Sequence, residues 1–256
     1  MKIASWNINS LRKRQERLIA WLAAFEPDVV CLQETKCTDD QFPTLALESA
    51  GYYASFHGQK SYNGVAIISK RRPSDVQTSL CDEVEDPQAR VIAATIGDVR
   101  VFCIYAPNGQ SVGSPAFKYK LEWYRRLQTC VAQSAPARNN VVVCGDFNVA
   151  PEGIDTHDAD LWRGAIMCSE EERSAFQSLC GSGFRDTLRL HHPEAGLYSW
   201  WDYRMLGFPK NLGLRIDAIL ASKPLVAKCT AAGIERETRK GKEPSDHAAV
   251  WAEFAL

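Results

Sequence analysis

The sequence predicts an α/β or α+β layered fold that forms one continuous domain. Short apolar runs bounded by turn residues recur along the 256 residues, as is typical of β-strands. Three longer stretches carry apolar residues at helical spacing. Strands are expected on both sides of the midpoint, and no Pro/Gly/Ser-rich linker divides the chain. We therefore expect a single domain over residues 1–256.

The expected strands are short runs distributed over the whole chain. They are Lys2–Ile8, Asp28–Gln33, Tyr52–His57, Gly64–Ser69, Val91–Ile96, Val99–Tyr105, Val141–Cys144, Leu214–Ala221 and Ala248–Phe254. Gly97 and Asp98 separate two of these runs, and this pair predicts a tight hairpin turn.

The helical stretches are Leu11–Phe25, Phe117–Gln133 and Glu170–Cys180. In the first of them Leu11, Leu18 and Leu22 recur on one face. Ser169, followed by three glutamates, is typical of a helix N-cap.

Composition allows many classes of enzyme. The chain is 45% hydrophobic and has 30 Lys and Arg against 31 Asp and Glu, a formal net charge of −1. This balance gives no sign of a nucleic-acid partner but does not exclude one, because acids elsewhere can offset a cationic face. The N-terminus lacks the pattern of a signal peptide and no apolar run reaches membrane-spanning length, so we expect a cytoplasmic protein.

The nine cysteines show no Cys-x-x-Cys spacing. Several lie within apolar runs, such as Cys31 and Cys144. We expect reduced, mostly buried thiols rather than a disulfide framework or a zinc site.

Polar residues at the ends of apolar strands carry the functional signal, since such ends tend to point into clefts of α/β proteins. Each of them alone has an ordinary structural explanation: a turn residue, an ion pair between Asp217 and Arg215, or a core histidine at 247. The residues are Asn7, Glu34, Asp146, Asn148, Asp217, Asp246 and His247.

As a set, these residues supply hard oxygen ligands, side-chain amides and a histidine with nearby acids. Hard oxygens suit Mg²⁺ or Mn²⁺ rather than zinc. A metal ion together with a cationic histidine meets the needs of in-line attack on a phosphodiester, in which negative charge grows on the phosphate oxygens. The set therefore predicts a metal-dependent phosphodiester hydrolase.

Six motifs in fixed order resemble the exonuclease III family of apurinic/apyrimidinic endonucleases. The resemblance covers essentially the whole chain, from Ile3 to about Phe254. The motifs are Leu32-Gln33-Glu34-Thr35-Lys36, Tyr62-Asn63-Gly64-Val65-Ala66, Tyr105-Ala106-Pro107-Asn108-Gly109, Gly145-Asp146-Phe147-Asn148-Val149-Ala150, Gly213-Leu214-Arg215-Ile216-Asp217 and Ser245-Asp246-His247.

The resemblance implies a deoxyribonuclease I-like four-layer α/β sandwich, with two mixed β-sheets packed face to face and helices outside. It implies a monomeric, Mg²⁺- or Mn²⁺-dependent DNA repair nuclease acting on double-stranded DNA with abasic sites or blocked 3′ ends. The expected activities are incision at abasic sites, 3′-phosphodiesterase or 3′-phosphatase action and 3′→5′ exonuclease action, in a ratio left open.

The resemblance also assigns metal ligands. Glu34 is expected to be the principal Mg²⁺ ligand, assisted by Asn7 and Asp246. The number of metal ions stays open.

Reaction roles follow in the same way. Asp146 is expected to orient or deprotonate the attacking water, and Asn148 to position it with the phosphate. His247 is expected to contact a phosphate oxygen, with Asp217 holding the ring cationic. Tyr105 is expected to contact the phosphate or the leaving oxygen.

Substrate contacts are expected at six further positions. Trp200, Leu214 and Ile216 match the apolar pocket that takes an extruded abasic sugar in the family, although simple core packing explains the last two equally well. Arg90 and Asn108 match contacts to the DNA backbone.

Met167 is the sixth position and departs from the family pattern at the border of this pocket. A bulky side chain there is expected to narrow the sugar site.

Phosphate contacts on a basic edge are expected at four further residues, although a lone lysine is more often a solvated surface charge. They are Lys36, Tyr62, Lys118 and Lys120.

Two other readings remain open at this point. The same core chemistry could serve a phosphatase or lipid phosphodiesterase, although no interfacial apolar element is evident. A non-catalytic nucleic-acid-binding regulator is the other alternative, although such a protein would be expected to have lost catalytic acids.

Overall fold

The computed structural model describes residues 1–134 and 139–256, and its strands form two six-stranded sheets. The first sheet contains β1 (Lys2–Asn7), β2 (Val29–Gln33), β3 (Tyr53–His57), β4 (Val65–Ser69), β11 (Cys229–Glu235) and β12 (Ala249–Phe254). The second contains β5 (Ser74–Gln77), β6 (Val91–Ile96), β7 (Val99–Tyr105), β8 (Asn140–Asp146), β9 (Phe184–Asp186) and β10 (Asp217–Ser222).

The helices are α1 (Leu11–Phe25), α2 (Thr44–Ser49), α3 (Pro115–Ser134), α4 (Glu170–Gly181), α5 (Thr187–His191) and α6 (Lys223–Val226). Short 3₁₀ turns lie at Asp39–Gln41, Gly153–Asp155 and Arg236–Arg239. None of the helices in the described ranges is long and apolar enough to span a bilayer.

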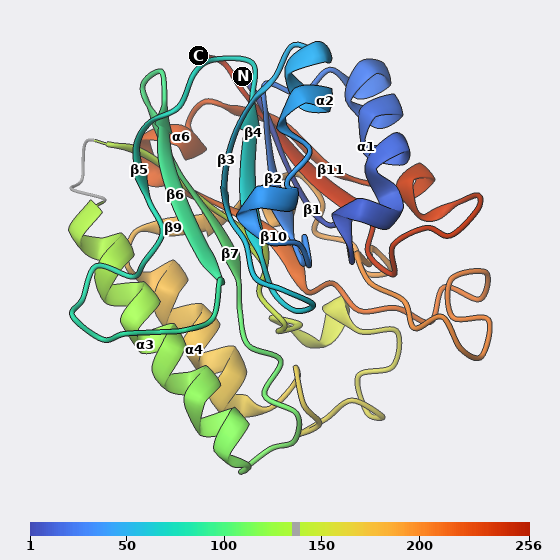
Figure 1. Cartoon of the computed structure of the whole chain (residues 1–256). Coiled ribbons are helices and arrows are strands. Elements are labelled where there is room, and N and C mark those ends of the chain that lie inside the picture. Colours follow the sequence, from blue (N-terminus) through green and yellow to red (C-terminus); the bar gives the residue numbers. More distant parts are fainter. Residues whose placement is uncertain (135–138) are drawn as a thin grey trace.

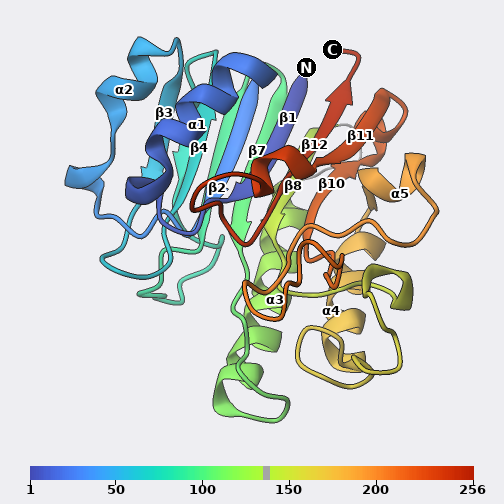
Figure 2. The ribbon, with the colours of Figure 1, turned by 90° about the vertical axis from the view of Figure 1, so that its right-hand side faces the viewer.

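Both sheets are mixed. Their strand orders are β11-β12-β1-β2-β4-β3 and β5-β6-β7-β8-β10-β9. One pair in each sheet is parallel, β1 with β2 and β7 with β8, while the other pairs are antiparallel. The sheets lie against each other, with α1 and α2 over one and α3 and α4 over the other (Figures 1 and 2). The predicted four-layer sandwich is confirmed.

Alternation of side chains along the strands explains the layers. In β1, Ile3 joins the cluster between the two sheets, whereas Ala4 and Trp6 point to the outer layer that receives Leu18 and Leu22 of α1. A third apolar cluster, which contains Trp123 and Leu127 of α3 and Phe176 of α4, fills the space outside the second sheet. Each sheet is therefore covered on both faces.

Local signals in the sequence agree with the structure. The predicted hairpin joins β6 to β7, with Ile96 opposite Val99 and Gly97 at a φ of 59°. The Ser169 hydroxyl caps α4 by accepting a hydrogen bond from the Glu172 backbone nitrogen, and the Glu172 carboxylate accepts one from the Ser169 backbone nitrogen. The helix predicted at Leu11–Phe25 is confirmed at both ends.

One prediction on the cysteines is wrong. Cys81, before the second sheet's central strands, and Cys130 in α3 are joined by a disulfide, with their Cα atoms 4.8 Å apart. Seven cysteines remain free, and five of these, including Cys31 and Cys144, are buried as expected. The disulfide partners are 49 residues apart in sequence, so they meet only because α3 packs against the loop that follows β5.

Candidate active site

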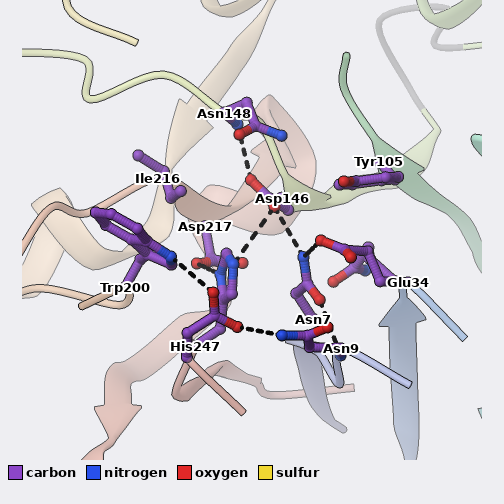
Figure 3. A network of polar contacts seen from close by, with 12 residues as sticks. Asn7, Asn9, Glu34, Tyr105, Asp146, Asn148, Trp200, Ile216, Asp217 and His247 are labelled. Carbon is purple, nitrogen blue, oxygen red and sulfur yellow. Dashed lines mark hydrogen bonds and ion pairs between the residues drawn. The ribbon is translucent and has the colours of Figure 1, made fainter. Parts of the chain in front are cut away.

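The ends of the two parallel strand pairs meet at one edge of the sandwich. Asn7 ends β1 and Glu34 follows β2, so both lie at the same edge of the first sheet. Tyr105 ends β7 and lies directly opposite Asp146 at the end of β8. Asp217 begins the antiparallel β10 and is also opposite Asp146. Face-to-face packing brings these edges together, and Figure 3 shows the resulting polar network.

Asn7 joins the two sheets at this edge. Its side-chain nitrogen donates hydrogen bonds to Glu34 Oε1 at 2.8 Å and to Asp146 Oδ2 at 2.9 Å (Figure 3). Its side-chain oxygen accepts from the backbone of Asn9. Asn7 is fully buried, so one amide holds a carboxylate from each sheet at a fixed separation.

His247 is held between two acids. Its Nδ1 lies 2.8 Å from Asp217 Oδ2, and its Nε2 lies 3.7 Å from Asp146 Oδ2. Burial disfavours the imidazolium, but the carboxylates of Asp217 and Asp146 outweigh that cost and raise the pKa of His247 to about 10. The histidine is therefore a cation at neutral pH, with a proton on each ring nitrogen.

For the Asp146 carboxyl group, the effect of burial outweighs that of the neighbouring positive charge. Burial and, less strongly, the charge of Asp217 raise its pKa to about 7, although His247 and the Asn7 amide pull it down. A carboxyl group with a pKa near neutrality is suited to accept a proton and release it again. Glu34 differs, because Lys36 and Asn7 overcome its burial and lower its pKa.

Asn148 lies in the loop after β8, two residues beyond Asp146. Its backbone nitrogen donates to Asp146 Oδ1 at 2.8 Å, and its side-chain nitrogen donates to the carbonyl of Ala106 at 2.9 Å. The exposed Asn108 donates from its own amide to Asn148 Oδ1 at 3.2 Å. Asn148 and Glu34 both have a left-handed backbone, with φ of 51° and 52°. Such backbone strain in residues other than glycine clusters at functional sites.

Tyr105 and Arg90 lie together on the Glu34 side of the site. The Arg90 guanidinium lies over the Tyr105 ring at 4.8 Å and donates to the Tyr105 carbonyl at 3.1 Å. Burial and the nearby carboxylates of Glu34 and Asp146 raise the pKa of the Tyr105 hydroxyl well above its usual range. The phenol therefore keeps its proton and can donate it in a hydrogen bond.

Asp246 lies next to His247 but outside the Asn7 bridge. Its Oδ1 accepts from the Asn9 side chain at 2.9 Å, and its Oδ2 accepts from the Trp200 indole at 3.1 Å. Asn9 also accepts from Lys36, whose Nζ lies 2.7 Å from Glu34 Oε2. Asp246 is thus linked to Glu34 through Asn9 and Lys36.

The donor set fits a hard divalent cation. Within the described ranges, Glu34, Asp146 and His247 form one group whose ligand atoms all lie within 4.8 Å of one another. The protonated ring of His247 has no lone pair to offer, so the oxygen donors of this group are the carboxylates of Glu34 and Asp146. Carboxylate oxygens are the ligands that Mg²⁺ and Mn²⁺ prefer.

An apolar cluster borders the Trp200 side of the site. Leu214 and Ile216 are almost fully buried, at 0% and 2% exposure, and pack with Ala150 and Cys168. Half-buried Met167 and Trp200, together with Trp162, pack against this cluster. The predicted pocket residues therefore lie together, and Leu214 lies beneath the partly exposed ones. Met167 has a φ of 68°.

The four predicted phosphate contacts have three different environments. Tyr62, 72% exposed, and Lys118 lie at the surface, and Lys36 is part of the polar network. Lys120 is fully buried, so its predicted place on a basic edge is wrong. Sequence reasoning also missed Asn9 and Ser245, whose hydroxyl donates to the Asn7 carbonyl at 2.6 Å. Ser245 lies within the Ser245-Asp246-His247 motif, and this motif could have identified it as a site residue.

Comparisons with known proteins agree over the full length. The model of the endonuclease/exonuclease/phosphatase family matches residues 4–247. Exodeoxyribonuclease III of Haemophilus influenzae is 38% identical and covers 99% of this chain and 100% of its own. The structure of the 3′ phosphatase NExo from Neisseria, bound to a product DNA hairpin, matches with a TM-score of 0.97 at 44% identity. An AP endonuclease from Archaeoglobus fulgidus matches with a TM-score of 0.96 at 38% identity. Both structural matches cover 100% of each chain.

Proposed function

The chain belongs to the endonuclease/exonuclease/phosphatase family, and from this premise we propose that it is a DNA repair nuclease of the exodeoxyribonuclease III type. It hydrolyses phosphodiester bonds in DNA. The relatives named as exodeoxyribonuclease III and AP endonuclease support this activity at 38% identity over the whole chain.

One observation carries the proposal. Asp146 is bonded to Asn7 of the opposite sheet at 2.9 Å and lies 3.7 Å from a histidine that Asp217 keeps cationic. A proton acceptor and a fixed positive charge thus lie side by side in a buried place. Hydrolysis of a phosphodiester requires both, because water must lose a proton while negative charge grows on the phosphate.

We assign the roles accordingly. The His247 imidazolium donates from Nε2 to a non-bridging phosphate oxygen. Asp146 orients the attacking water and accepts its proton, and Asn148 positions that water and the phosphate. The Tyr105 hydroxyl donates to the leaving oxygen. These groups are held before substrate arrives, so little reorganisation is needed during the reaction.

We propose Mg²⁺, or Mn²⁺, as the cofactor. Glu34 is the principal ligand, with Asn7 and Asp246 as assisting groups. The bound metal would supply positive charge to the phosphate oxygens and a lower pKa to a bound water. The carboxylate pair of Glu34 and Asp146 supports this choice, because it offers hard oxygen donors.

We propose double-stranded DNA with blocked 3′ ends as the preferred substrate, with incision at abasic sites as the weaker activity. Met167 supports this order, because its side chain packs on the apolar cluster of Leu214 and Ile216, where an extruded sugar would bind. Trp200 forms the other partly exposed wall. Arg90 and Asn108 are assigned to the DNA backbone.

We also propose that residues 1–256 form one domain that acts as a monomer in the cytoplasm. The cluster between the sheets supports one domain, because it contains side chains from both, such as Ile3 and Val101. Seven of the nine cysteines are free, which supports a reducing compartment, although the Cys81–Cys130 disulfide is uncommon in such a compartment.

The test is a comparison of rates on two duplexes, one with an internal abasic analogue and one with a 3′-phosphate at a nick, in Mg²⁺ and in chelator. We expect cleavage of both with Mg²⁺, faster at the nick. Absence of turnover on both duplexes would contradict the proposed function, whereas a faster abasic rate would contradict only the proposed preference.

A further inference from the structure

A buried ion pair lies next to the active site but contributes no atom to it. Lys120 of α3 and Glu172 of α4 are both 0% exposed, and their Nζ and Oε1 atoms are in direct contact. Burying two charges is costly even when they pair, and apolar residues of similar volume often stabilise a core as well or better. Stability alone therefore does not account for this pair.

The lysine end of the pair holds two loops of the active site. Lys120 Nζ donates to the carbonyl of Asn148 at 2.8 Å and to the carbonyl of Asn108 at 3.1 Å. These loops follow β8 and β7, the two strands whose ends carry Asp146 and Tyr105. Lys120 thereby fixes the strained backbone of Asn148 from behind, where its φ is 51°.

The position of the Asn148 carbonyl also fixes the Asn148 side chain. The Asn148 amide spans from the Ala106 carbonyl, at 2.9 Å, to the Asn108 amide, at 3.2 Å. Both anchoring groups lie in the loop whose Asn108 carbonyl Lys120 also holds. A shift of the lysine would therefore move the Asn148 amide relative to Asp146.

The glutamate end of the pair holds the border of the predicted sugar pocket. Glu172 accepts from the backbone nitrogen of Met167 at 3.0 Å, and from the backbone and hydroxyl of Ser169 at 3.1 Å and 2.7 Å. The Met167 carbonyl in turn accepts from the backbone of Ala150 at 2.8 Å. The turn that carries Met167 is thus tied to the loop that carries Asn148.

We propose that Lys120 and Glu172 are positioning residues that couple the Asn148 amide to the Met167 turn, so that one buried pair sets both the turnover and the preference between 3′ ends and abasic sites. This inference rests on the proposed function. Neither side chain touches the substrate, and both act through the backbone they hold.

The test replaces both charges at once. In the double variant Lys120→Met/Glu172→Leu the core keeps its volume and has no unpaired charge, so we expect the fold to persist. We expect kcat on a 3′-phosphate nick to fall about 10- to 100-fold, since a displacement of about 1 Å can cost that much, while KM changes less than about threefold. We also expect the ratio of abasic to 3′-end rates to change by about fivefold or more.

Arg126→Met is the matched control on the same helix. Arg126 is also buried and paired, but with Asp82 and Asp86 of the loop before β6. We expect it to lower the melting temperature while leaving kcat and the activity ratio unchanged. A folded double variant with the kcat and ratio of the unsubstituted enzyme would overturn the proposal.

Two further measurements keep the proposal testable if the double variant does not fold. Lys120→Met/Glu172→Gln also leaves no unpaired charge, and its amide keeps one acceptor oxygen for the backbone of the Met167 turn. It loses the lysine contacts to Asn108 and Asn148, so kcat should fall about 10- to 100-fold, as in the first double variant. The NMR signal of the Asn148 side-chain amide should shift in Lys120→Met/Glu172→Gln and not in Arg126→Met. An unmoved Asn148 amide signal would overturn the positioning role, whether or not the enzyme is active. Absence of turnover by the unsubstituted enzyme would instead contradict the proposed function.

Discussion

Asp217 accepts a hydrogen bond from Nδ1 of His247 at 2.8 Å, and this contact turns the other ring nitrogen toward Asp146. The second carboxylate oxygen of Asp217 is buried and has no partner in residues 1–134 and 139–256. The negative charge of Asp217 is therefore directed at the imidazolium, which explains why His247 stays cationic inside the protein.

Asp217→Asn should lower the pKa of His247 and reduce turnover about 10²-fold or more. The cationic form is the active one, so activity is present below the pKa of about 10 and is lost as the pH rises through it. Without the Asp217 charge, burial dominates, and the alkaline limb of the kcat/KM profile should move to lower pH. Profiles between pH 6 and 11 measure this.

Asp82→Asn is the control for this shift, because Asp82 pairs with Arg126 away from His247. The alkaline limb of the kcat/KM profile of Asp82→Asn should coincide with that of the unsubstituted enzyme. An unmoved limb in Asp217→Asn would contradict the role of the Asp217 charge.

Glu34→Gln should weaken the dependence on Mg²⁺. The amide keeps the hydrogen bond from Asn7 but removes a hard anionic donor. We expect the Mg²⁺ concentration for half-maximal activity to rise about tenfold or more, as measured by titration of Mg²⁺ into enzyme treated with chelator. Glu253→Gln, at a surface pair with Lys2, should leave the titration unchanged. Equal titrations for both variants would count against Glu34 as the principal ligand.

Met167→Gly should raise the rate of abasic-site incision relative to 3′-end processing. The substitution removes the side chain that packs on the apolar cluster, and glycine suits the φ of 68°, so the backbone need not move. Side-by-side rates on the two duplexes measure the ratio. Met167→Leu keeps the bulk and should keep the ratio. If glycine and leucine gave the same ratio, Met167 would not limit the pocket.

Gly145→Ala should destabilise the fold by roughly 2–4 kcal/mol. Gly145 has a φ of 154°, and a Cβ atom there would lie 1.8 Å from the Ile104 carbonyl oxygen of the neighbouring strand. Urea unfolding measures the loss. Gly181→Ala, at the end of α4 with open space around it, should keep or raise stability by up to about 1 kcal/mol. Equal stabilities for the two variants would contradict the close approach of β7 and β8.

The sequence predicted the long elements and the polar strand ends well, because both are local patterns. β6, β7, α1 and α4 have clear periodicity, and the ends of parallel strands necessarily meet at one edge. Elements without apolar alternation were not predicted. β9 has only three residues, and the seven-residue edge strand β11 contains Ala231, Ala232 and Gly233, so neither shows that pattern.

Contacts between residues far apart in the sequence could not be predicted. Lys120 looks like a surface lysine until Glu172, 52 positions away, packs against it. The same holds for Cys81 and Cys130. The predicted sites of Asn7, Glu34 and Asp146 came from strand position and the family motifs, but the amide that joins them depends on the packing of the two sheets.

The most direct test of the central claim is Asp146→Asn on a duplex with a 3′-phosphate at a nick. The variant keeps the size of the side chain but cannot accept a proton from water. We expect the single-turnover rate in Mg²⁺ to fall by about 10³-fold or more, with DNA affinity measured in the same buffer changed less than about threefold. A variant that bound DNA and cleaved it at the rate of the unsubstituted enzyme would contradict the account.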